Sequence, residues 1–329
     1  MWQGEAMAPL PTAIIVAGPT CSGKSALALA LAKYFRGRVL NADSMQVYRD
    51  LRVLTARPTP EEEALAPHRL YGVLDAAVTG SVAWWRAAAL DEMRAAWAAG
   101  ELPILCGGTG MYLRALIEGL VEVPDPGDAA RQEARAVLEA EGAAALHARL
   151  LAADPETARD LRPTDGQRLA RAWEVWRGTG HGLAWWRARP GLPPAACRFL
   201  AIRLDPPRPD LRAAIARRFH AMMEQGAPEE VAALMARRLS PDLPAMRAHG
   251  VPELAALLRG EMGREAALER AILNTGRYTR RQATWFNHHR LAAPEDEMCV
   301  TARFDPSAQL LERESEKYEI FIQTQLTRG

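Results

Sequence analysis

The sequence predicts an α/β protein: a parallel sheet flanked by helices and interrupted by a mostly helical insertion. Short apolar runs rich in β-branched residues alternate with longer Ala-rich segments of helical character, which is the order found in parallel sheets with crossover helices. A Pro/Gly cluster, EVPDPGD at 122–128, then opens a long Arg- and Glu-rich helical stretch that reaches about residue 190. With 329 residues, 49% of them hydrophobic, the chain can bury the core that this fold requires.

Four short apolar runs are expected to form strands of the sheet: TAIIVA (12–17), RVLNAD (38–43), LPILCGG (102–108) and CRFLAIRLD (197–205). The helix SALALALAKYF follows the first run and is expected to end at Gly37, and an Ala-rich helix at 84–100 precedes the third run. After the fourth run, PDLRAAIARRFHAMMEQG predicts a helix that ends at Gly226, and APEEVAALMARRL predicts another.

These elements define the expected domain organisation. The core comprises residues 12–122 and 198–300, and residues 123–197 form the helical insertion. Residues 1–11 are expected to be a tail. A second tail is expected at 301–329, where the stretch LLERESEKYEIFIQTQLTRG contains no alanine in an otherwise Ala-rich chain. We expect this C-terminal segment to be poorly ordered.

Composition and charge exclude several classes of protein. The 41 basic and 40 acidic residues nearly cancel, so no global field draws the chain to nucleic acid or membrane, and any basic surface must be local. The four cysteines are scattered, without the spacing of a zinc site or a disulfide framework, which favours a reducing cytoplasm. No signal peptide or membrane-spanning run is apparent, so we expect no membrane association.

The segment GPTCSGKS at 18–25 matches the phosphate-binding pattern G-x-x-x-x-G-K-[ST], and it lies between an expected strand and an expected helix. This context predicts a P-loop. Lys24 would reach the terminal phosphate, and the Ser25 hydroxyl is placed to ligate Mg²⁺. The chain has only three lysines, so a lysine retained inside the motif points to chemistry that needs a compact charge. The whole loop is expected to bind a diphosphate or nucleotide: Gly18, Pro19, Thr20, Cys21, Ser22, Gly23, Lys24 and Ser25.

The other strand ends decide what the loop holds. A nucleotide hydrolase would offer a second apolar strand that ends in Asp, but the run at 102–108 continues as ILCGGTG without a carboxylate. Its three glycines allow close backbone approach to a ligand, with Thr109 among them, although an ordinary strand-to-helix turn is an alternative. Asp43 follows the second strand in NADSMQVY and should face the crevice at the carboxyl edge of the sheet. From local sequence it could be a metal ligand, a helix N-cap or a base.

Seven blocks, in this order, resemble bacterial tRNA dimethylallyltransferases, also called tRNA isopentenyltransferases: GPTCSGKS, NADSMQVYRDL, TARP, LCGGTGMYLRALIEGL, RPTDGQRLARAWEVWRGTG, RRFHAMMEQGAPEEV and YTRRQATWF. The resemblance spans about residues 13 to 290. Two segments depart from the family pattern: HGVPEL (249–254) stands where the family has roughly GYRE and so lacks its Tyr, and HRLYGVLD (68–75) replaces a more compact His-rich segment.

The resemblance implies transfer of the dimethylallyl group from dimethylallyl diphosphate to the exocyclic N6 amine of the adenosine on the 3′ side of a tRNA anticodon. Diphosphate would leave into the P-loop, with Lys24 and Mg²⁺ neutralising its charge. Asp43 matches the catalytic aspartate, which would take the proton of the amine. Thr109 matches a threonine that contacts the incoming nucleotide or diphosphate. Arg218, rather than its neighbour Arg217, best matches an arginine that clamps the diphosphate.

The resemblance also implies a set of residues that bind tRNA: Asp43, Ser44, Met45, Gln46, Thr109, Arg131, Gln167, Arg168, Leu169, Ala170 and Arg171. The insertion would then carry part of the tRNA-binding surface, and the target adenine would be flipped out to reach the crevice. The stretch NTGRYTRRQATWFNHHR (274–290) interleaves arginines with aromatic residues and has no acid. By itself it is equally compatible with an RNA contact and with a packed amphipathic helix whose basic face is solvated.

Three other functions fit parts of the pattern. A P-loop small-molecule kinase would transfer phosphate from ATP, but lid arginines and a base-binding site are not identifiable. An isopentenyltransferase acting on free adenine nucleotides would need neither the large insertion nor the basic-aromatic stretch. A non-catalytic RNA-binding module would have no use for Lys24, Ser25 and Asp43 converging on one crevice. We therefore expect a cytoplasmic, monomeric enzyme with tRNA and dimethylallyl diphosphate as its substrates.

Overall fold

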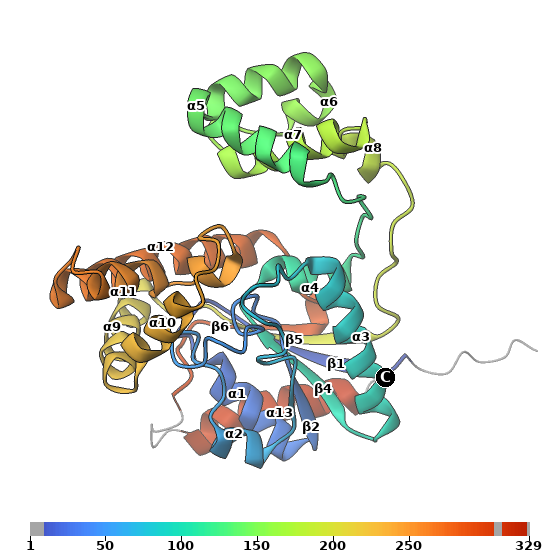
Figure 1. The fold of residues 1–329 in the computed structure, drawn as a ribbon. Coiled ribbons are helices and arrows are strands. Elements are labelled where there is room, and N and C mark those ends of the chain that lie inside the picture. Colours follow the sequence, from blue (N-terminus) through green and yellow to red (C-terminus); the bar gives the residue numbers. More distant parts are fainter. Residues whose placement is uncertain (1–9, 306–310, 328–329) are drawn as a thin grey trace, which may run out of the picture. The chain divides into compact units, whose positions relative to one another are not determined.

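A parallel sheet forms the centre of the larger of two units in the computed structural model, which describes residues 10–305 and 311–327 (Figure 1). Within those residues the sheet has six strands in the order β3-β2-β4-β1-β5-β6, and every pairing is parallel. Their bounds are β1 (Thr12–Ala17), β2 (Gly37–Asn41), β3 (His68–Arg69), β4 (Leu102–Gly107), β5 (Arg198–Leu204) and β6 (Glu297–Val300). The predicted fold class is confirmed, and the four predicted strands lie at the expected positions.

Alternate residues of each central strand point to opposite faces of the sheet and enter two different cores. Ile14 and Val16 of β1 pack on one side, while Ala13 and Ile15 pack on the other. Helices cover both faces, so the strands are buried from both sides and read as continuous apolar runs. Because the sheet is parallel, the carboxyl ends of β1, β2 and β4 meet at one edge, where the loops that follow them come together.

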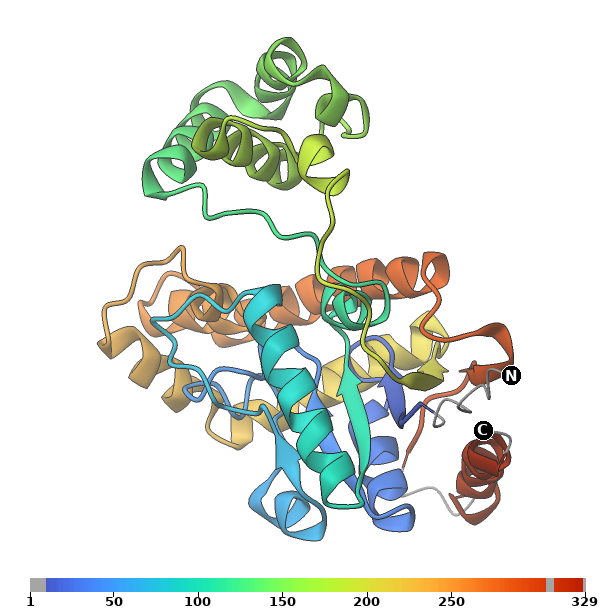
Figure 2. The same ribbon diagram turned by 90° about the vertical axis from the view of Figure 1, so that its right-hand side faces the viewer.

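The helices divide between the two faces of the sheet (Figures 1 and 2). One core contains side chains of α1 (Lys24–Tyr34) and α13 (Leu311–Thr327). The other core takes its helical side chains from α3 (Val82–Ala98), α4 (Gly110–Ile117), α9 (Arg208–Glu224), α10 (Ala227–Ala236), α11 (Val251–Leu258) and α12 (Arg264–His288). A short helix, α2 (Pro60–Leu65), begins with a capping box formed by Thr59 and Glu62.

The expectation of a poorly ordered C-terminal tail is wrong for residues 311–327, which form α13. Tyr318 and Ile322, four residues apart, lie on one face of this helix and are buried in the core beside α1. Arg198 of β5 also donates hydrogen bonds to the backbone oxygen and the side chain of Gln325. The missing alanines were therefore no sign of disorder, because the apolar residues have helical spacing. The expected N-terminal tail lies almost entirely outside the described residues.

Two glycines at expected helix ends behave differently. Gly226, with φ of 97°, lies between α9 and α10 in the left-handed conformation expected at a helix end. Gly37 does not end α1, which stops at Tyr34, and it begins β2 instead. A Cβ at Gly37 would lie 2.6 Å from Ile104 Cδ1 and 3.1 Å from backbone atoms of Ala32 and Leu102, so a larger residue would require these neighbours to shift.

The second compact unit spans residues 118–194, close to the 123–197 expected for the insertion. It is mostly helical, as predicted, and comprises α5 (Asp128–Ala153), α6 (Pro155–Arg159), α7 (Gly166–Thr179) and α8 (Leu183–Arg187). Helix α5 is kinked at Gly142, where φ is 83°. The unit has its own core, in which α5 and α7 pack through buried residues that include Leu146, Leu150 and Leu169. This independent core is consistent with a separately folded insertion.

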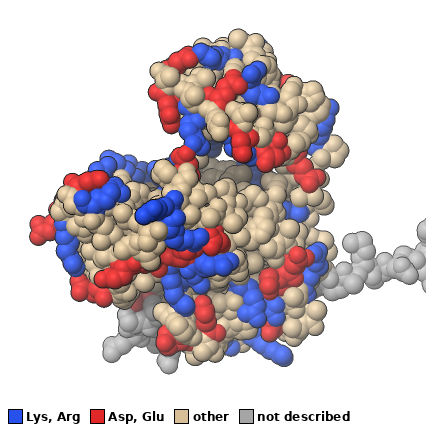
Figure 3. All heavy atoms as spheres, in the orientation of Figure 1, with Lys and Arg blue, Asp and Glu red and all other residues tan. Residues whose placement is uncertain are grey.

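Charged side chains of both signs are interspersed over the face shown in Figure 3, in agreement with the near-zero net charge. Among the described residues, no helix combines the length and apolar character needed to cross a membrane.

Candidate active site

The segment GPTCSGKS forms the loop between β1 and α1, at the carboxyl edge of the sheet. Gly23 has φ of 93°, and a Cβ there would lie 2.0 Å from the backbone oxygen of Phe304, so both conformation and space require glycine. Lys24 begins α1 and is only 9% exposed, with Nζ 3.5 Å from the backbone oxygen of Pro19. The loop thus places the unpaired N–H groups of a helix N-terminus beside a lysine, which is the geometry of an anion site.

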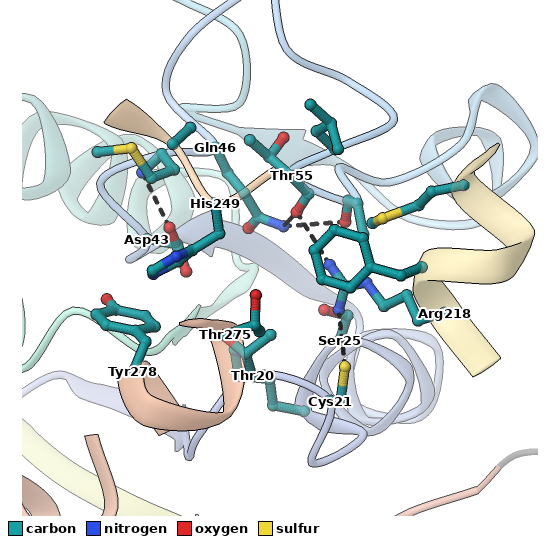
Figure 4. Close-up of a pocket in the computed structure, with 17 residues that line it drawn as sticks. Thr20, Cys21, Ser25, Asp43, Gln46, Thr55, Arg218, His249, Thr275 and Tyr278 are labelled. Atoms are coloured by element: carbon teal, nitrogen blue, oxygen red, sulfur yellow. Dashed lines mark hydrogen bonds between the residues drawn. The ribbon is translucent and has the colours of Figure 1, made fainter. Parts of the chain in front are cut away.

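A cavity of about 80 Å³ lies beside this loop (Figure 4). Its wall is formed by polar groups of this loop, by the segment that follows β2, by α9 and α12, and by the residues that precede α11. The polar lining comprises Thr20, Cys21, Lys24, Ser25, Asp43, Gln46, Thr55, Arg218, His249, Thr275 and Tyr278. The apolar lining comprises Met45, Leu54, Ala56, Phe219, Met222 and Ala248. One cavity therefore joins an anion-binding loop, a carboxylate and an apolar wall.

Asp43 faces this cavity, and its loop fixes its orientation (Figure 4). The backbone N–H of Met45 donates to Asp43 Oδ1 at 2.9 Å, and the backbone N–H of Asp43 donates to Asn41 Oδ1 at 2.8 Å. Asn41 is fully buried and also donates to the backbone oxygens of Asp43 and Leu70. These bonds form a turn rather than a helix cap, so of the three roles left open for Asp43 the N-cap is excluded.

Arg218 of α9 is the arginine that reaches the cavity. Its Nη2 donates to the backbone oxygen of Thr55 at 3.3 Å, and its Nη1 lies 3.6 Å from Cys21 Sγ in the phosphate loop (Figure 4). Arg217 is exposed and does not line the cavity. Of the two neighbouring arginines, Arg218 therefore lines the cavity together with Lys24, and its role as a clamp on a diphosphate stays a prediction.

Thr109 does not line the cavity. Its Oγ1 accepts a hydrogen bond from the backbone N–H of Ser44 at 2.9 Å, and its own N–H donates to the backbone oxygen of Ala42 at 3.1 Å. Both partners flank Asp43. In this structure Thr109 therefore holds the loop that carries the carboxylate.

The glycines around Thr109 do not leave space for a ligand, contrary to expectation. A Cβ at Gly107 would lie 2.1 Å from the backbone of Ala42, and one at Gly108 would lie 2.2 Å from Gln282 Nε2. A Cβ at Gly110 would lie 2.3 Å from the ring of Trp285. These positions are glycine because the chain's own loop and α12 pack against them.

His249 and Tyr278 are among the lining residues of the cavity that were not identified from the sequence as site residues. Both line the cavity near Asp43 and contact each other, with ring centroids 4.7 Å apart (Figure 4). Burial lowers the pKa of His249, and burial together with the nearby charge of Asp43 raises the pKa of Tyr278. At neutral pH the imidazole is therefore uncharged and the phenol keeps its proton. The departure of HGVPEL from the family pattern was the only sequence signal near His249.

Helix α12 carries most of the basic-aromatic stretch (274–290), for which the sequence left open an RNA contact or a packed amphipathic helix. The aromatic residues face the protein: Tyr278 lines the cavity, Trp285 packs against Gly110, and Phe286 is buried. The arginines of the stretch are exposed: Arg277, Arg280, Arg281 and Arg290. The stretch is thus a packed amphipathic helix, and it also presents a basic face to solvent.

The predicted tRNA-binding residues of the insertion lie on α5 and α7. Gln167, Arg168 and Arg171 are exposed, and Arg131 is half-buried in ion pairs with Asp125 and Asp128. Ala170 is half-buried. Leu169 is fully buried in the core of the helical unit, so its side chain stabilises α7 and is not presented to an RNA. In the other unit, Ser44, Met45 and Gln46 follow Asp43, and Gln46 donates to the backbone oxygens of Thr55 and Ala56.

The site's oxygen donors fit a magnesium ion that is held together with a diphosphate. Ser25 is an exposed residue that lines the cavity, one residue beyond Lys24. Within residues 10–305 and 311–327, no cluster of three or more His, Cys, Asp or Glu side chains could hold a metal by itself. Mg²⁺ commonly binds through one or two protein oxygens, with phosphate oxygens and waters completing its shell. Ser25 beside an anion-binding loop matches that donor set.

The parallel sheet, the loop after its first strand and the carboxylate beside that loop define the protein as a P-loop enzyme. The family model described as IPP transferase matches residues 46–289. A tRNA dimethylallyltransferase from Gluconobacter oxydans is 68% identical over 311 residues, which are 94% of this chain and 94% of that protein. Another, from Gluconacetobacter diazotrophicus, is 63% identical and covers 91% of this chain and 90% of that protein.

Solved structures agree with the sequence comparison. The crystal structure of a tRNA isopentenylpyrophosphate transferase from Bacillus halodurans is 29% identical with a TM-score of 0.65, covering 97% of this chain and 99% of that chain. A eukaryotic dimethylallyltransferase has the same fold, with a TM-score of 0.75 over 95% of this chain and 80% of that chain. The chain belongs to the IPP transferase family, which confirms the resemblance seen in its sequence blocks.

Proposed function

We propose that the protein transfers the dimethylallyl group of dimethylallyl diphosphate to N6 of the adenosine on the 3′ side of a tRNA anticodon, with release of diphosphate. The observation that carries this proposal is the single cavity that joins the phosphate loop, Arg218 and Asp43. A donor with a charged end and an apolar end, and an acceptor that must lose a proton, both find matching groups there.

The phosphate loop would hold the leaving group. Its backbone N–H groups, Lys24 and Arg218 surround one end of the cavity, where charge develops on diphosphate as the allylic C–O bond breaks. Fixed positive groups stabilise that charge more in the transition state than in the bound substrate, and this difference lowers the barrier. The five-carbon chain would lie against the apolar wall formed by Leu54, Phe219 and Met222.

Asp43 would accept the proton of the acceptor amine. The lone pair of an adenine amine is delocalised into the ring, so the amine becomes acidic only as its bond to carbon forms. Asp43 Oδ1 is engaged by the Met45 N–H, and Oδ2 has no partner among the hydrogen bonds of the site, so Oδ2 is the oxygen available to the amine. The new C–N bond forms, the C–O bond breaks, the electron pair leaves with diphosphate, and the proton moves to the carboxylate.

Mg²⁺ is the cofactor that we assign to this reaction, with Ser25 as its protein ligand. When bound, it would supply positive charge to the diphosphate oxygens. Lys24 and Arg218 would orient the same oxygens.

Two observations support tRNA as the acceptor: the exposed arginines of the protein and the substrate named for its relatives. The relatives named above are tRNA dimethylallyltransferases, and α12 and α7 present arginines to solvent. Arginines of this kind follow phosphates, and flipping of the adenine would bring its amine to Asp43. We further propose that the enzyme acts as a monomer in the cytoplasm. The kinase alternative finds less support, because the matched family and its named relatives transfer prenyl groups.

The experiment is an incubation of the protein with Mg²⁺, dimethylallyl diphosphate and an unmodified tRNA, followed by digestion to nucleosides and mass spectrometry. We expect dimethylallyl-adenosine. A tRNA in which the adenosine next to the anticodon is replaced by guanosine serves as the control and should remain unmodified. Equal modification of both tRNAs would refute the proposed acceptor site.

A further inference from the structure

We infer that Gln282 is a positioning residue that ties the phosphate loop to the loop carrying Thr109, and that transfer depends on this tie. Gln282 lies on α12 and is only 4% exposed. Its Oε1 accepts a hydrogen bond from the backbone N–H of Thr20 at 2.9 Å, and its Nε2 donates to the backbone oxygen of Gly108 at 2.9 Å. The inference rests on the proposed function, because it concerns the geometry of that reaction.

The two bonds fix the amide in one orientation. Thr20 offers a donor and Gly108 offers an acceptor, so a flipped amide would place two donors together at one loop and two acceptors together at the other. Neither a leucine nor a methionine could satisfy either group. The side chain is therefore matched chemically to both loops at once.

The packing around Gly108 leaves little tolerance. A Cβ at Gly108 would lie 2.2 Å from Gln282 Nε2 and 3.2 Å from the backbone oxygen of Gly18. The backbone that follows β4 is thus in close contact with the phosphate loop and with the Gln282 amide of α12, and no space is left between them for a side chain. A change in the length or polarity of residue 282 must shift at least one of the loops.

A short chain of hydrogen bonds leads from this amide to Asp43. Gly108 precedes Thr109, whose Oγ1 accepts from the N–H of Ser44 and whose N–H donates to the oxygen of Ala42. Gln282 thereby links the phosphate loop, which would hold the diphosphate, to the loop that carries Asp43, the proposed base. Transfer requires both to be placed correctly at the same moment, and an error of about 1 Å in such placement can reduce a rate about a hundredfold.

Two substitutions separate this role from simple stability. Gln282→Met removes both hydrogen bonds at similar length. Gln282→Glu keeps an acceptor for Thr20, but its second oxygen faces the Gly108 carbonyl, where an ionised carboxylate is repelled and a protonated one donates. Burial and this contact raise the pKa of such a carboxyl. Lowering the pH should therefore restore the missing donor in the Glu variant and have no comparable effect in the Met variant.

The test measures kcat and KM for dimethylallyl diphosphate and for tRNA, relative to wild type, between pH 6 and pH 8. We expect Gln282→Met to lower kcat on the order of 10- to 100-fold while the KM for tRNA stays within about twofold. We expect the kcat of Gln282→Glu, as a fraction of wild type, to rise as pH falls. Gln323→Met, an exposed change on α13, is the matched control and should retain wild-type kinetics.

The inference is overturned if Gln282→Met keeps kcat within twofold of wild type, or if the Glu variant shows the same pH dependence as the Met variant. If the Met variant does not fold, the Glu variant alone decides. Absence of transfer by wild type would refute the proposed function instead. In that case, calorimetric binding of inorganic pyrophosphate tests the tie: we expect about tenfold weaker binding by Gln282→Glu at pH 8, and unchanged binding would overturn it.

Discussion

Replacing Asp43 with asparagine removes the proposed proton acceptor and preserves the turn that carries it. In the structure, Asp43 Oδ1 accepts from the N–H of Met45, and an asparagine Oδ1 can accept the same bond. The oxygen that changes is Oδ2, which becomes an NH₂ group and can no longer take a proton from the amine. The substitution therefore tests the role of Asp43 as proton acceptor while the turn that carries it stays the same.

The magnitude follows from that geometry. A positioned general base contributes about 10²- to 10⁴-fold to a rate, so we expect Asp43→Asn to slow transfer about a thousandfold, equivalent to about 4 kcal/mol of barrier. Diphosphate binding should persist, because Lys24, Arg218 and the phosphate loop are unchanged.

Single-turnover transfer from labelled dimethylallyl diphosphate to tRNA measures this loss directly, since it excludes product release. Calorimetric measurement of pyrophosphate binding checks that the phosphate loop is intact in the variant. Asp91→Asn, at an exposed ion pair with Arg94 on α3, is the matched control and should leave the rate within twofold. A rate for Asp43→Asn within threefold of wild type would remove Asp43 from the role of base.

Three further predictions test other parts of the structure. Arg218→Ala should raise the KM for dimethylallyl diphosphate and lower kcat at least tenfold, whereas Arg217→Ala should do neither; steady-state kinetics that fail to distinguish them would contradict the clamp. Ile322→Ala should lower the free energy of unfolding in urea by about 3 kcal/mol, and a change below 0.5 kcal/mol would show that α13 is not docked. Burial raises the pKa of Cys106 to about 11 from 9.0, so the unfolded state loses that proton first and stability should fall between pH 9 and pH 11. Cys106→Ala should reduce this slope in urea titrations, and an unchanged slope would count against it.

Sequence patterns predicted the elements whose signal is local. The strands β1, β2, β4 and β5 are apolar runs buried on both faces, and the phosphate loop is a contiguous motif. Strand β3 has only two residues and β6 has four with little burial, so neither has an apolar run that could be detected. The absence of alanine from α13 gives no sign of a helix, and only the four-residue spacing of the buried Tyr318 and Ile322 indicates one.

The site was predictable in part. Lys24, Ser25, Asp43 and Arg218 line one cavity, although they come from three separate segments. The role of Gln282 could not be predicted, because its partners Thr20 and Gly108 are 262 and 174 residues away in the chain. Within its own helix a buried glutamine shows no local pattern, and only the tertiary fold brings its amide between two loops.

The central claim is that the phosphates stay in the loop while the alkyl group moves to tRNA. Parallel reactions with dimethylallyl diphosphate and Mg²⁺ should be run with unmodified tRNA and with AMP, beside a reaction with γ-labelled ATP. We predict dimethylallyl-adenosine in the tRNA, release of pyrophosphate, little product from AMP and no transfer of labelled phosphate. Labelled phosphate on an acceptor without allyl transfer, or alkylation of AMP with tRNA left unmodified, would contradict the account.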